Sequence, residues 1–381
     1  MKLPVYLDYS ATTPVDPRVA AKMIPFLTED FGNPASHSHA YGWTAEKAVE
    51  EARGHVAALI GADPREIVWT SGATEADNLA IKGAAHFYRE KGKHLITVKT
   101  EHKAVLDSMR HLETEGYEVT YLDVQEDGLI DLEALRAAMR PDTILVSVMA
   151  VNNETGAVYD IPSLARLVKS LCPNALFHTD AVQAFTKIPS GLWKSADLVS
   201  VSSHKIHAPK GVGALFVRKG VRLVPCITGG GQENGLRSGT EALPSICAMA
   251  AAAEDAMRTF SEDAEKVAGL NAYLREKLAA LDGVVLNTGH IGFSPHILSI
   301  AVPGLRSEIF LRFLSERGIY VSAGSACSAK HADNRVLAAF GLPDRIADST
   351  LRLSFSAYNT REECDEFVNA LSEGMRMLIH T

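Results

Sequence analysis

Short apolar runs alternate with stretches of helical periodicity between about residues 44 and 220. Continuous apolar runs are typical of strands buried on both faces, and such strands joined by amphipathic helices form crossover units. The pattern therefore predicts an α/β protein with a doubly wound, mostly parallel sheet. The expected strands are Glu66–Thr70, His94–Val98, Glu118–Leu122, Thr143–Met149, Ala175–His178, Leu198–Ser202 and Gly213–Val217.

Helical spacing of apolar residues fills the intervals between these strands. Apolar residues that recur three or four positions apart form one face, which a helix packs against a sheet. Asp131 is the expected N-cap of one helix, because an Asp side chain accepts hydrogen bonds from the first free backbone N–H groups. The expected helices are Trp43–Ile60, Thr74–Tyr88, Ala104–Glu113, Leu132–Met139 and Pro162–Leu171.

The pattern changes after a Gly-rich segment near Gly229–Gly239. A long Ala-rich helix is expected from Glu241 to about Ala280, and its apolar part is too short for a membrane span, so we interpret it as a buried helix that bridges two domains. The predicted boundaries are 15–255 for a large domain, and 1–14 with 256–381 for a smaller α/β domain. In the smaller domain the pattern predicts strands at His296–Val302, Tyr320–Ser322 and Leu351–Phe355, and helices at Arg306–Arg317 and Glu362–Ile379.

The composition is that of a folded protein whose partner is a small molecule or another protein. Hydrophobic residues make up 46% and charged residues 22% of the chain, which excludes disordered and collagen-like classes. The net charge of −8, without a Lys/Arg-rich run, offers no general attraction to nucleic acid or to an anionic membrane. We therefore expect no nucleic-acid partner and no membrane attachment.

Five cysteines are scattered along the chain without Cys-x-x-Cys spacing. This usage predicts neither a disulfide framework nor a cysteine zinc site, and it fits a reducing compartment. The first residues lack the basic and then apolar profile of a signal peptide, so we expect a cytoplasmic protein. The cysteines are Cys172, Cys226, Cys247, Cys327 and Cys364.

Three polar segments follow predicted strands and together point to one chemistry. Thr70–Glu75 could form an anion site at a helix N-terminus, Asp180 ends a strand, and Lys205 follows another strand 25 residues later (205 − 180). Taken singly, each has a plain structural explanation: a capped turn, a helix cap and a surface lysine. Taken together, they are what pyridoxal 5′-phosphate (PLP) needs: a phosphate site, a partner for the pyridine nitrogen and a Schiff-base lysine.

Several ordered motifs resemble one family over nearly the whole chain. On these motifs the chain resembles the cysteine desulfurases of the NifS/IscS kind, within the class V group of fold-type I PLP enzymes. The motifs are YLDYSATTP at Tyr6–Pro14, FGNPASHSHAYG at Phe31–Gly42, TSGATEADNLAIKG at Thr70–Gly83, TEHKAVL at Thr100–Leu106, VNNETG at Val151–Gly156, HTDAVQ at His178–Gln183, SSHKIHAPKGVG at Ser202–Gly213, GGGQENGLRSGT at Gly229–Thr240 and SAGSACS at Ser322–Ser328.

The resemblance implies a PLP-dependent transferase fold of type I and a role for each matching residue. Lys205 would link covalently to PLP, Asp180 would pair with its pyridine nitrogen, Gln183 would reach its ring hydroxyl and His102 would lie over the ring. Thr240 would reach the cofactor of the neighbouring subunit, which implies a homodimer with shared active sites. The further cofactor-binding residues would be Ala73, Thr74, Ser202 and His204, and the residues for the substrate carboxylate would be Asn153 and Arg352.

Cys327 lies in a run of small residues that is typical of a loop, whereas Cys172, Cys226 and Cys247 lie in or beside apolar segments and are expected to be packing residues. Acidic neighbours of Cys364 disfavour its thiolate. The resemblance implies that L-cysteine is converted to L-alanine, with a persulfide on Cys327 and with Lys205 and His102 as the other catalytic residues. The sulfur would pass to an Fe–S scaffold or another acceptor protein.

Other functions remain open at this stage. A selenocysteine lyase or another class V PLP aminotransferase would share the PLP residues, although an aminotransferase has no need of Cys327. A sulfur-relay adaptor could keep the fold without turnover, but it would have no use for Lys205 and Asp180. Read singly, His102 could be a core or surface histidine and Arg352 a surface-strand charge. The histidines lack the carboxylate or cysteine neighbours that a metal site needs, so no metal is expected.

Overall fold

The computed structural model describes residues 4–289, 292–323 and 335–378. Its larger part is built on a seven-stranded sheet in the order β2-β8-β7-β6-β5-β3-β4. Strand β8 runs antiparallel to both of its neighbours and the other strand pairs are parallel, so the sheet is mixed but mostly parallel. The strands are β2 Ile67–Thr70, β3 His94–Val98, β4 Glu118–Leu122, β5 Thr143–Ser147, β6 Leu176–Asp180, β7 Leu198–Ser202 and β8 Gly213–Val217.

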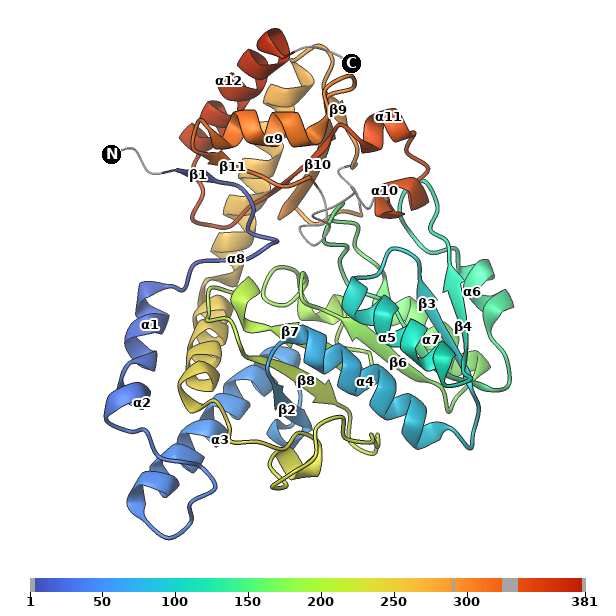
Figure 1. Cartoon of the computed structure of the whole chain (residues 1–381), viewed down its shortest axis with the longest axis vertical. Helices are drawn as coiled ribbons and strands as arrows, with labels where there is room; N and C mark the ends of the chain where they lie inside the picture. The colour runs from blue at the N-terminus through green and yellow to red at the C-terminus, as the bar shows by residue number, and fades with distance from the viewer. Residues whose placement is uncertain (1–3, 290–291, 324–334, 379–381) are drawn as a thin grey trace.

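Helices cover both faces of this sheet (Figure 1). Successive side chains of a strand point to opposite faces, so Leu95 joins one apolar core and Ile96 the other. Helices α4 and α5 pack on the first face, and α3, α7 and the first half of α8 contribute to the core on the second. The helices are α3 Ala40–Ile60, α4 Ala73–Tyr88, α5 Lys103–Thr114, α6 Leu132–Ala138, α7 Ile161–Leu171 and α8 Leu243–Ala279.

Helix α8 joins the two parts of the molecule (Figure 1). Its 37 residues rise about 1.5 Å each, which is enough to bury Leu243 in the core of the large sheet and Leu274 in a separate core. The predicted domain division at residue 255 falls inside this helix and stays a prediction. In the described part of the chain, no helix is both long and apolar enough to span a membrane.

The smaller part combines a three-stranded antiparallel sheet, β12-β10-β9, with a parallel pair formed by β1 and β11. The N-terminal segment belongs to this part, because Val5 and Leu7 lie in its apolar core. Its elements are β1 Val5–Tyr6, β9 Val285–Leu286, β10 Ile297–Ala301, α9 Ser307–Ser315, β11 Ile319–Tyr320, α11 Asp344–Ala347, β12 Thr350–Ser354 and α12 Arg361–Met377. Helices α1 Pro17–Met23 and α2 Pro25–Thr28 lead into α3, and α10 Arg335–Ala339 packs on the core of the larger part through Val336.

The α/β class and the predicted strands and helices are confirmed, with shifts at their ends. Asp131 caps α6 by accepting a hydrogen bond from the Glu133 N–H. The strand predicted at Ala175–His178 continues to Asp180, and the one predicted at Thr143–Met149 ends at Ser147. The two-residue strands β1 and β9 and the short helices α1, α2, α10 and α11 were not predicted, because so few residues carry no periodicity.

Candidate active site

A cavity of about 490 Å³ opens where β6 and β7 end. The carboxyl ends of parallel strands meet at one edge of a sheet, which is where open α/β sheets bind their ligands. The cavity brings together segments that the sequence analysis treated separately. Ten of the predicted residues line it: Ala73, Thr74, His102, Asn153, Asp180, Gln183, Ser202, His204, Lys205 and Arg352.

Lys205 ends a short 3₁₀ turn, Ser203–Lys205, that directly follows β7. Its Nζ donates hydrogen bonds to the carbonyl oxygens of Ser10 and Ala11, both at 2.6 Å. The Ser203 hydroxyl secures the turn by donating to the Val212 carbonyl at 2.8 Å. The amine is therefore held in the cavity between the sheet and the N-terminal segment.

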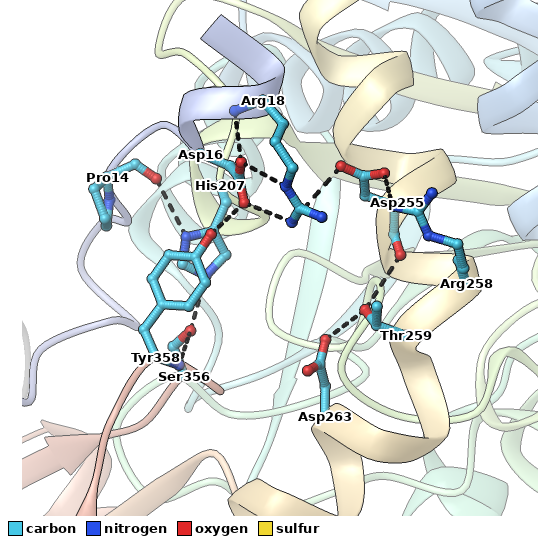
Figure 2. A network of polar contacts seen from close by, with 10 residues as sticks. All are labelled: Pro14, Asp16, Arg18, His207, Asp255, Arg258, Thr259, Asp263, Ser356 and Tyr358. Carbon is cyan, nitrogen blue, oxygen red and sulfur yellow. Dashed lines mark hydrogen bonds and ion pairs between the residues drawn. The ribbon is translucent and has the colours of Figure 1, made fainter.

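The segment after Lys205 is tied to both parts of the molecule. His207 has a left-handed φ of 63°, which is uncommon outside glycine, and its Nε2 contacts the Ser356 hydroxyl at 2.9 Å. The His207 carbonyl accepts from the Asp16 N–H at 3.0 Å. Figure 2 shows the continuation of this network, in which the Asp16 carboxylate accepts from Arg18 and from the Tyr358 hydroxyl. These contacts fix the lysine segment from several sides.

Asp180 is the last residue of β6, and its Oδ1 accepts from the Val182 N–H at 2.9 Å. Burial raises the pKa of this carboxyl, and the cationic forms of His102 and Lys205 oppose that rise. Behind it, burial and then the Asp180 charge raise the pKa of Asp77 well above its usual value. A protonated pyridine nitrogen would give Asp180 the cationic partner that a buried carboxylate needs, so this residue fits PLP.

The N-terminus of α4 forms the anion-binding side of the cavity. Gly72 precedes the helix with a φ of 152°, and a Cβ placed on Gly213 would lie 2.7 Å from the Gly72 Cα. Two glycines therefore permit the tight approach of these backbones. The free N–H groups of the first helical turn, at Ala73 and Thr74, lie with Ser202 in the cavity lining, which suits a phosphate.

His204 completes this side of the cavity and stays neutral. Burial lowers its pKa to about 4, and Lys205, Lys210 and Lys187 lower it further. Its Nδ1 lies 3.1 Å from the Thr12 hydroxyl. A neutral imidazole can donate a hydrogen bond to an anion without adding a charge.

His102 is the N-cap of α5 and faces the cavity. Its Nδ1 accepts from the Ala104 N–H at 3.2 Å, so the proton of the neutral ring resides on Nε2. Burial lowers the pKa of the imidazole. The negative charge of Asp180 raises this pKa, and the positive charges of Lys205 and Arg335 lower it further. His102 is therefore a neutral donor through Nε2.

Arg352 lies on β12, which brings the small sheet to the cavity. The guanidinium donates from Nη1 to the Asn153 carbonyl at 3.0 Å and from Nη2 to the Asp8 carboxylate at 2.8 Å. Its Nε is buried and has no hydrogen-bond partner among the described residues. A planar group held in this way can receive a carboxylate in a fixed orientation.

Of the predicted residues that the structure describes, Thr240 is not among those that line the cavity. Cys327 lies outside the described residues. Thr240 is exposed, and a role toward a neighbouring subunit remains a prediction. The backbone of Ser322, five residues before Cys327, pairs with Arg352, and Arg335, eight residues after it, lines the cavity.

Some cavity residues were missed although their motifs had been recognised. Glu101 precedes His102 in the same motif, and Ser10 belongs to the N-terminal one. Ser10 contributes its backbone carbonyl, and a backbone role leaves no pattern in the sequence. Arg335 has no motif at all. Among the described residues, no group of three His, Cys, Asp or Glu side chains is placed to hold a metal ion.

The other cysteines correct one expectation. Cys226 is exposed rather than packed, because the segment after β8 runs over the surface. Cys172 and Cys247 are partly buried, and Cys364 is buried. Burial, and then Glu363, Asp365 and Glu362, raise the pKa of Cys364 to about 12, so its thiol stays protonated.

Comparisons with known proteins agree with this geometry. Residues 5–367 match the family model described as aminotransferase class-V. A protein named cysteine desulfurase IscS from Methylococcus capsulatus is 51% identical, over 99% of this chain and 94% of its own. A solved structure titled NIFS-like protein superposes with a TM-score of 0.93 at 40% identity, covering 99% of this chain and all of its own. Another, titled SspA in complex with cysteine, has a TM-score of 0.81 at 37% identity and covers 93% and 99% of the two chains.

The fold and the cavity define a PLP-dependent enzyme of fold type I. More specifically, the chain belongs to the class-V aminotransferase family.

Proposed function

We propose that this protein is a cysteine desulfurase, which uses PLP to convert L-cysteine to L-alanine and transfers the sulfur to Cys327. The observation that carries the proposal is the convergence of Lys205, Asp180 and Arg352 in one cavity, since these residues supply a covalent anchor, a pyridinium partner and a carboxylate site. The relatives named cysteine desulfurase IscS support the same reaction.

The residues of the cavity divide into groups with separate tasks. Lys205 would hold the cofactor covalently, Asp180 would pair with its nitrogen, Gln183 would donate to its ring oxygen and His102 would cover its face. When bound, PLP supplies an electron sink for the negative charge that develops on the substrate Cα. The phosphate would lie among Ala73, Thr74, Ser202 and His204.

The substrate carboxylate would bind Arg352 beside Asn153, which orients the Cα proton toward the amine of Lys205. That amine, released from the cofactor, would remove the proton, and the Nε2 of His102 would donate or accept protons nearby. A structural relative whose title places it in complex with cysteine supports L-cysteine as the substrate.

Sulfur transfer requires a thiolate that reaches the substrate. The Cys327 thiolate would bond to the substrate sulfur, the Cβ–S bond would break with its electron pair left on carbon, and protonation of the carbon fragment would lead to alanine. Ser322 pairs with Arg352 at the cavity, and five residues (327 − 322) can extend up to about 17 Å. That reach supports Cys327 as the acceptor.

We further propose a cytoplasmic homodimer that passes the persulfide sulfur to an Fe–S scaffold or another acceptor protein. The exposure of Thr240, on a segment that the Arg237–Glu75 ion pair ties to α4, supports a role for this residue at the cofactor of a neighbouring subunit. Sedimentation of the purified protein tests the dimer, and transfer of ³⁵S from the persulfide to a scaffold protein tests the acceptor.

Substitution of Cys327 separates this function from its alternatives. Cys327→Ser should abolish sulfide release from L-cysteine and leave the protein yellow with bound PLP, whereas an aminotransferase would keep its activity. Cys226→Ser is the matched control, because that thiol is exposed and lies outside the cavity lining. Full desulfurase activity in Cys327→Ser would contradict the mechanism, and PLP that remains reducible onto the protein in Lys205→Ala would contradict the lysine assignment.

A further inference from the structure

A second lysine, Lys187, lies close behind the cavity. It follows β6 by seven residues (187 − 180), and its Nζ donates to the Gln183 Oε1 at 2.8 Å. The residue before it, Thr186, has a left-handed φ of 62°, which is unfavourable for a β-branched side chain. The turn therefore adopts a strained conformation that brings Lys187 back onto Gln183.

The Gln183 amide connects this lysine to Lys205. Its Nε2 donates to the Ser10 carbonyl at 2.9 Å, and the same carbonyl accepts from the Lys205 Nζ at 2.6 Å. Gln183 also lines the cavity. Lys187 and Lys205 thus converge on one backbone oxygen, the first through an amide and the second directly.

The partners of Gln183 allow one orientation of its amide. A lysine ammonium donates hydrogen bonds and cannot accept them, and a backbone carbonyl only accepts. The oxygen of the amide must therefore face Lys187, and the nitrogen must face Ser10. The NH₂ group has two hydrogens, and Ser10 takes one, so the other can be donated to a ligand in the cavity.

The charges around Lys187 are mostly positive. Burial lowers its pKa to about 7, and Lys205 and Arg352 lower it further. The ammonium is held by the neutral Gln183 amide, and no carboxylate of the described residues forms an ion pair with it. The titratable and charged groups whose charges interact with it are Lys205, Arg352, His204, His207 and His296.

We propose that Lys187 is a positioning residue that fixes the Gln183 amide with its nitrogen toward the cavity. The inference rests on the proposed function, in which Gln183 meets the ring oxygen of PLP. An N–H donor there stabilises the anionic form of that oxygen, which lowers the pKa of the chromophore formed with Lys205. An amide turned the other way would present an oxygen and oppose the same anion.

The experiment is a spectroscopic titration of the PLP-loaded protein. Lys187→Met removes the donor, and we expect the pKa of the chromophore to rise by about one unit, the usual size of one lost hydrogen bond or nearby charge. Lys187→Arg keeps a donor, so the pKa of its chromophore should stay close to that of the unaltered protein. Lys47→Met is the control: this lysine is 77% exposed on α3, and its loss should leave the pKa of the chromophore unchanged.

A double-mutant cycle tests whether Lys187 acts through Gln183. Gln183→Leu alone should raise the same pKa, and adding Lys187→Met should then change it little. An additive shift would overturn the proposal in favour of a direct effect of the lysine charge, and an unshifted Lys187→Met would overturn it outright. Failure of the unaltered protein to take up PLP would instead contradict the proposed function.

A second measurement needs no destabilising substitution. In the unaltered protein, the side-chain amide NMR signals of Gln183 should move once at the pKa of the chromophore, which the absorption spectrum gives, and once more as Lys187 loses its proton. Lys187→Arg should abolish the second step, because arginine keeps its proton. A step away from the chromophore pKa that persists in Lys187→Arg would overturn the proposal.

Discussion

Asp8 and Arg352 form an ion pair, Oδ1 to Nη2 at 2.8 Å, across 344 positions of the sequence. The arginine side chain is 2% exposed and the aspartate 18%. Arg352 therefore enters the cavity already oriented by the N-terminal segment on one side and by the Asn153 carbonyl on the other. The N-terminal segment thus contributes to the proposed substrate site as well as to the fold.

Loss of the Asp8 charge should weaken the substrate site. We expect Asp8→Asn to raise the KM for L-cysteine about tenfold, since one charge-assisted hydrogen bond that orients Arg352 is lost, with PLP still bound. Steady-state kinetics and the absorption of bound PLP measure the two effects. Asp63→Asn removes a similar but exposed carboxylate partner of Arg65 and should leave KM unchanged. A KM for Asp8→Asn equal to that of Asp63→Asn would contradict the role of this pair.

The Gly-rich segment depends on a buried ion pair between Arg53 and Glu233. Two hydrogen bonds of 2.8 Å join them, and a Glu233 oxygen also accepts from the Trp69 N–H at 2.8 Å. Their side chains are 8% and 2% exposed. Glu233 and the following Asn234 both have left-handed φ values, so the pair holds a strained turn in place.

Glu233→Gln should destabilise the fold by about 3 kcal/mol, because it removes the buried counter-charge of Arg53 and leaves only the exposed Glu50 carboxylate beside it. Glu50→Gln is the matched control: Glu50 pairs with the Nε of the same arginine but is 59% exposed, so its loss should cost less than about 1 kcal/mol. Denaturant unfolding gives both values. Equal losses in the two variants would show that burial does not set the strength of this pair.

Much of the site could be predicted because its residues lie where parallel strands end. Asp180 ends β6 and Lys205 follows the adjacent β7, and the turn before α4 lies beside them, so local motifs identify residues that the fold brings together. The class of fold follows from the same repetition of strands and helices.

Other parts of the site could not be predicted because they depend on distant contacts. Asp8 meets Arg352, and the Ser10 carbonyl meets both Gln183 and Lys205, through tertiary packing that leaves no local periodicity. Lys187 lies in none of the motifs, and only the turn at Thr186 places it on Gln183.

Buried neutral histidines should make the protein sensitive to acid. Burial lowers the pKa of His178 to about 3, and its ring contacts the hydroxyls of Ser147 at 2.8 Å and Ser200 at 3.0 Å. A histidine in the unfolded chain takes up a proton near pH 6.5. The stability that this group contributes is therefore complete above pH 6.5 and is lost as the pH falls toward 3, by about 1.4 kcal/mol per pH unit.

Between pH 6 and pH 4, the free energy of unfolding of His178→Asn should fall less steeply with pH than that of the unaltered protein. The difference in slope should be about 1.4 kcal/mol per pH unit. The variant is also expected to be less stable at pH 7, so the slope rather than the absolute stability is the measure. His55→Asn, at a histidine that is 48% exposed, should keep the slope of the unaltered protein. An unchanged slope in His178→Asn would mean that its ring takes up a proton in the folded state.

Glu75 places a negative charge beside the proposed phosphate site. It lies in the first turn of α4, where Arg237 donates to its Oε1 at 2.9 Å and the Ser71 N–H to its Oε2 at 2.8 Å. Burial alone would raise the pKa of this carboxyl, but the hydrogen bonds from Arg237 and Ser71 outweigh it and lower the pKa. The carboxylate is therefore ionised, and Arg237 neutralises it.

Arg237→Met should weaken the binding of PLP about tenfold, because the Glu75 carboxylate would then repel the phosphate without compensation. Adding Glu75→Gln should restore most of the affinity, since it removes the repelling charge. Reconstitution of the apoprotein with increasing PLP measures the affinity of both variants. Arg218→Met is the control, because it breaks an ion pair of a different arginine with Asp197. If the double variant binds as weakly as Arg237→Met alone, the arginine acts by shaping the Gly-rich segment and not by neutralising Glu75.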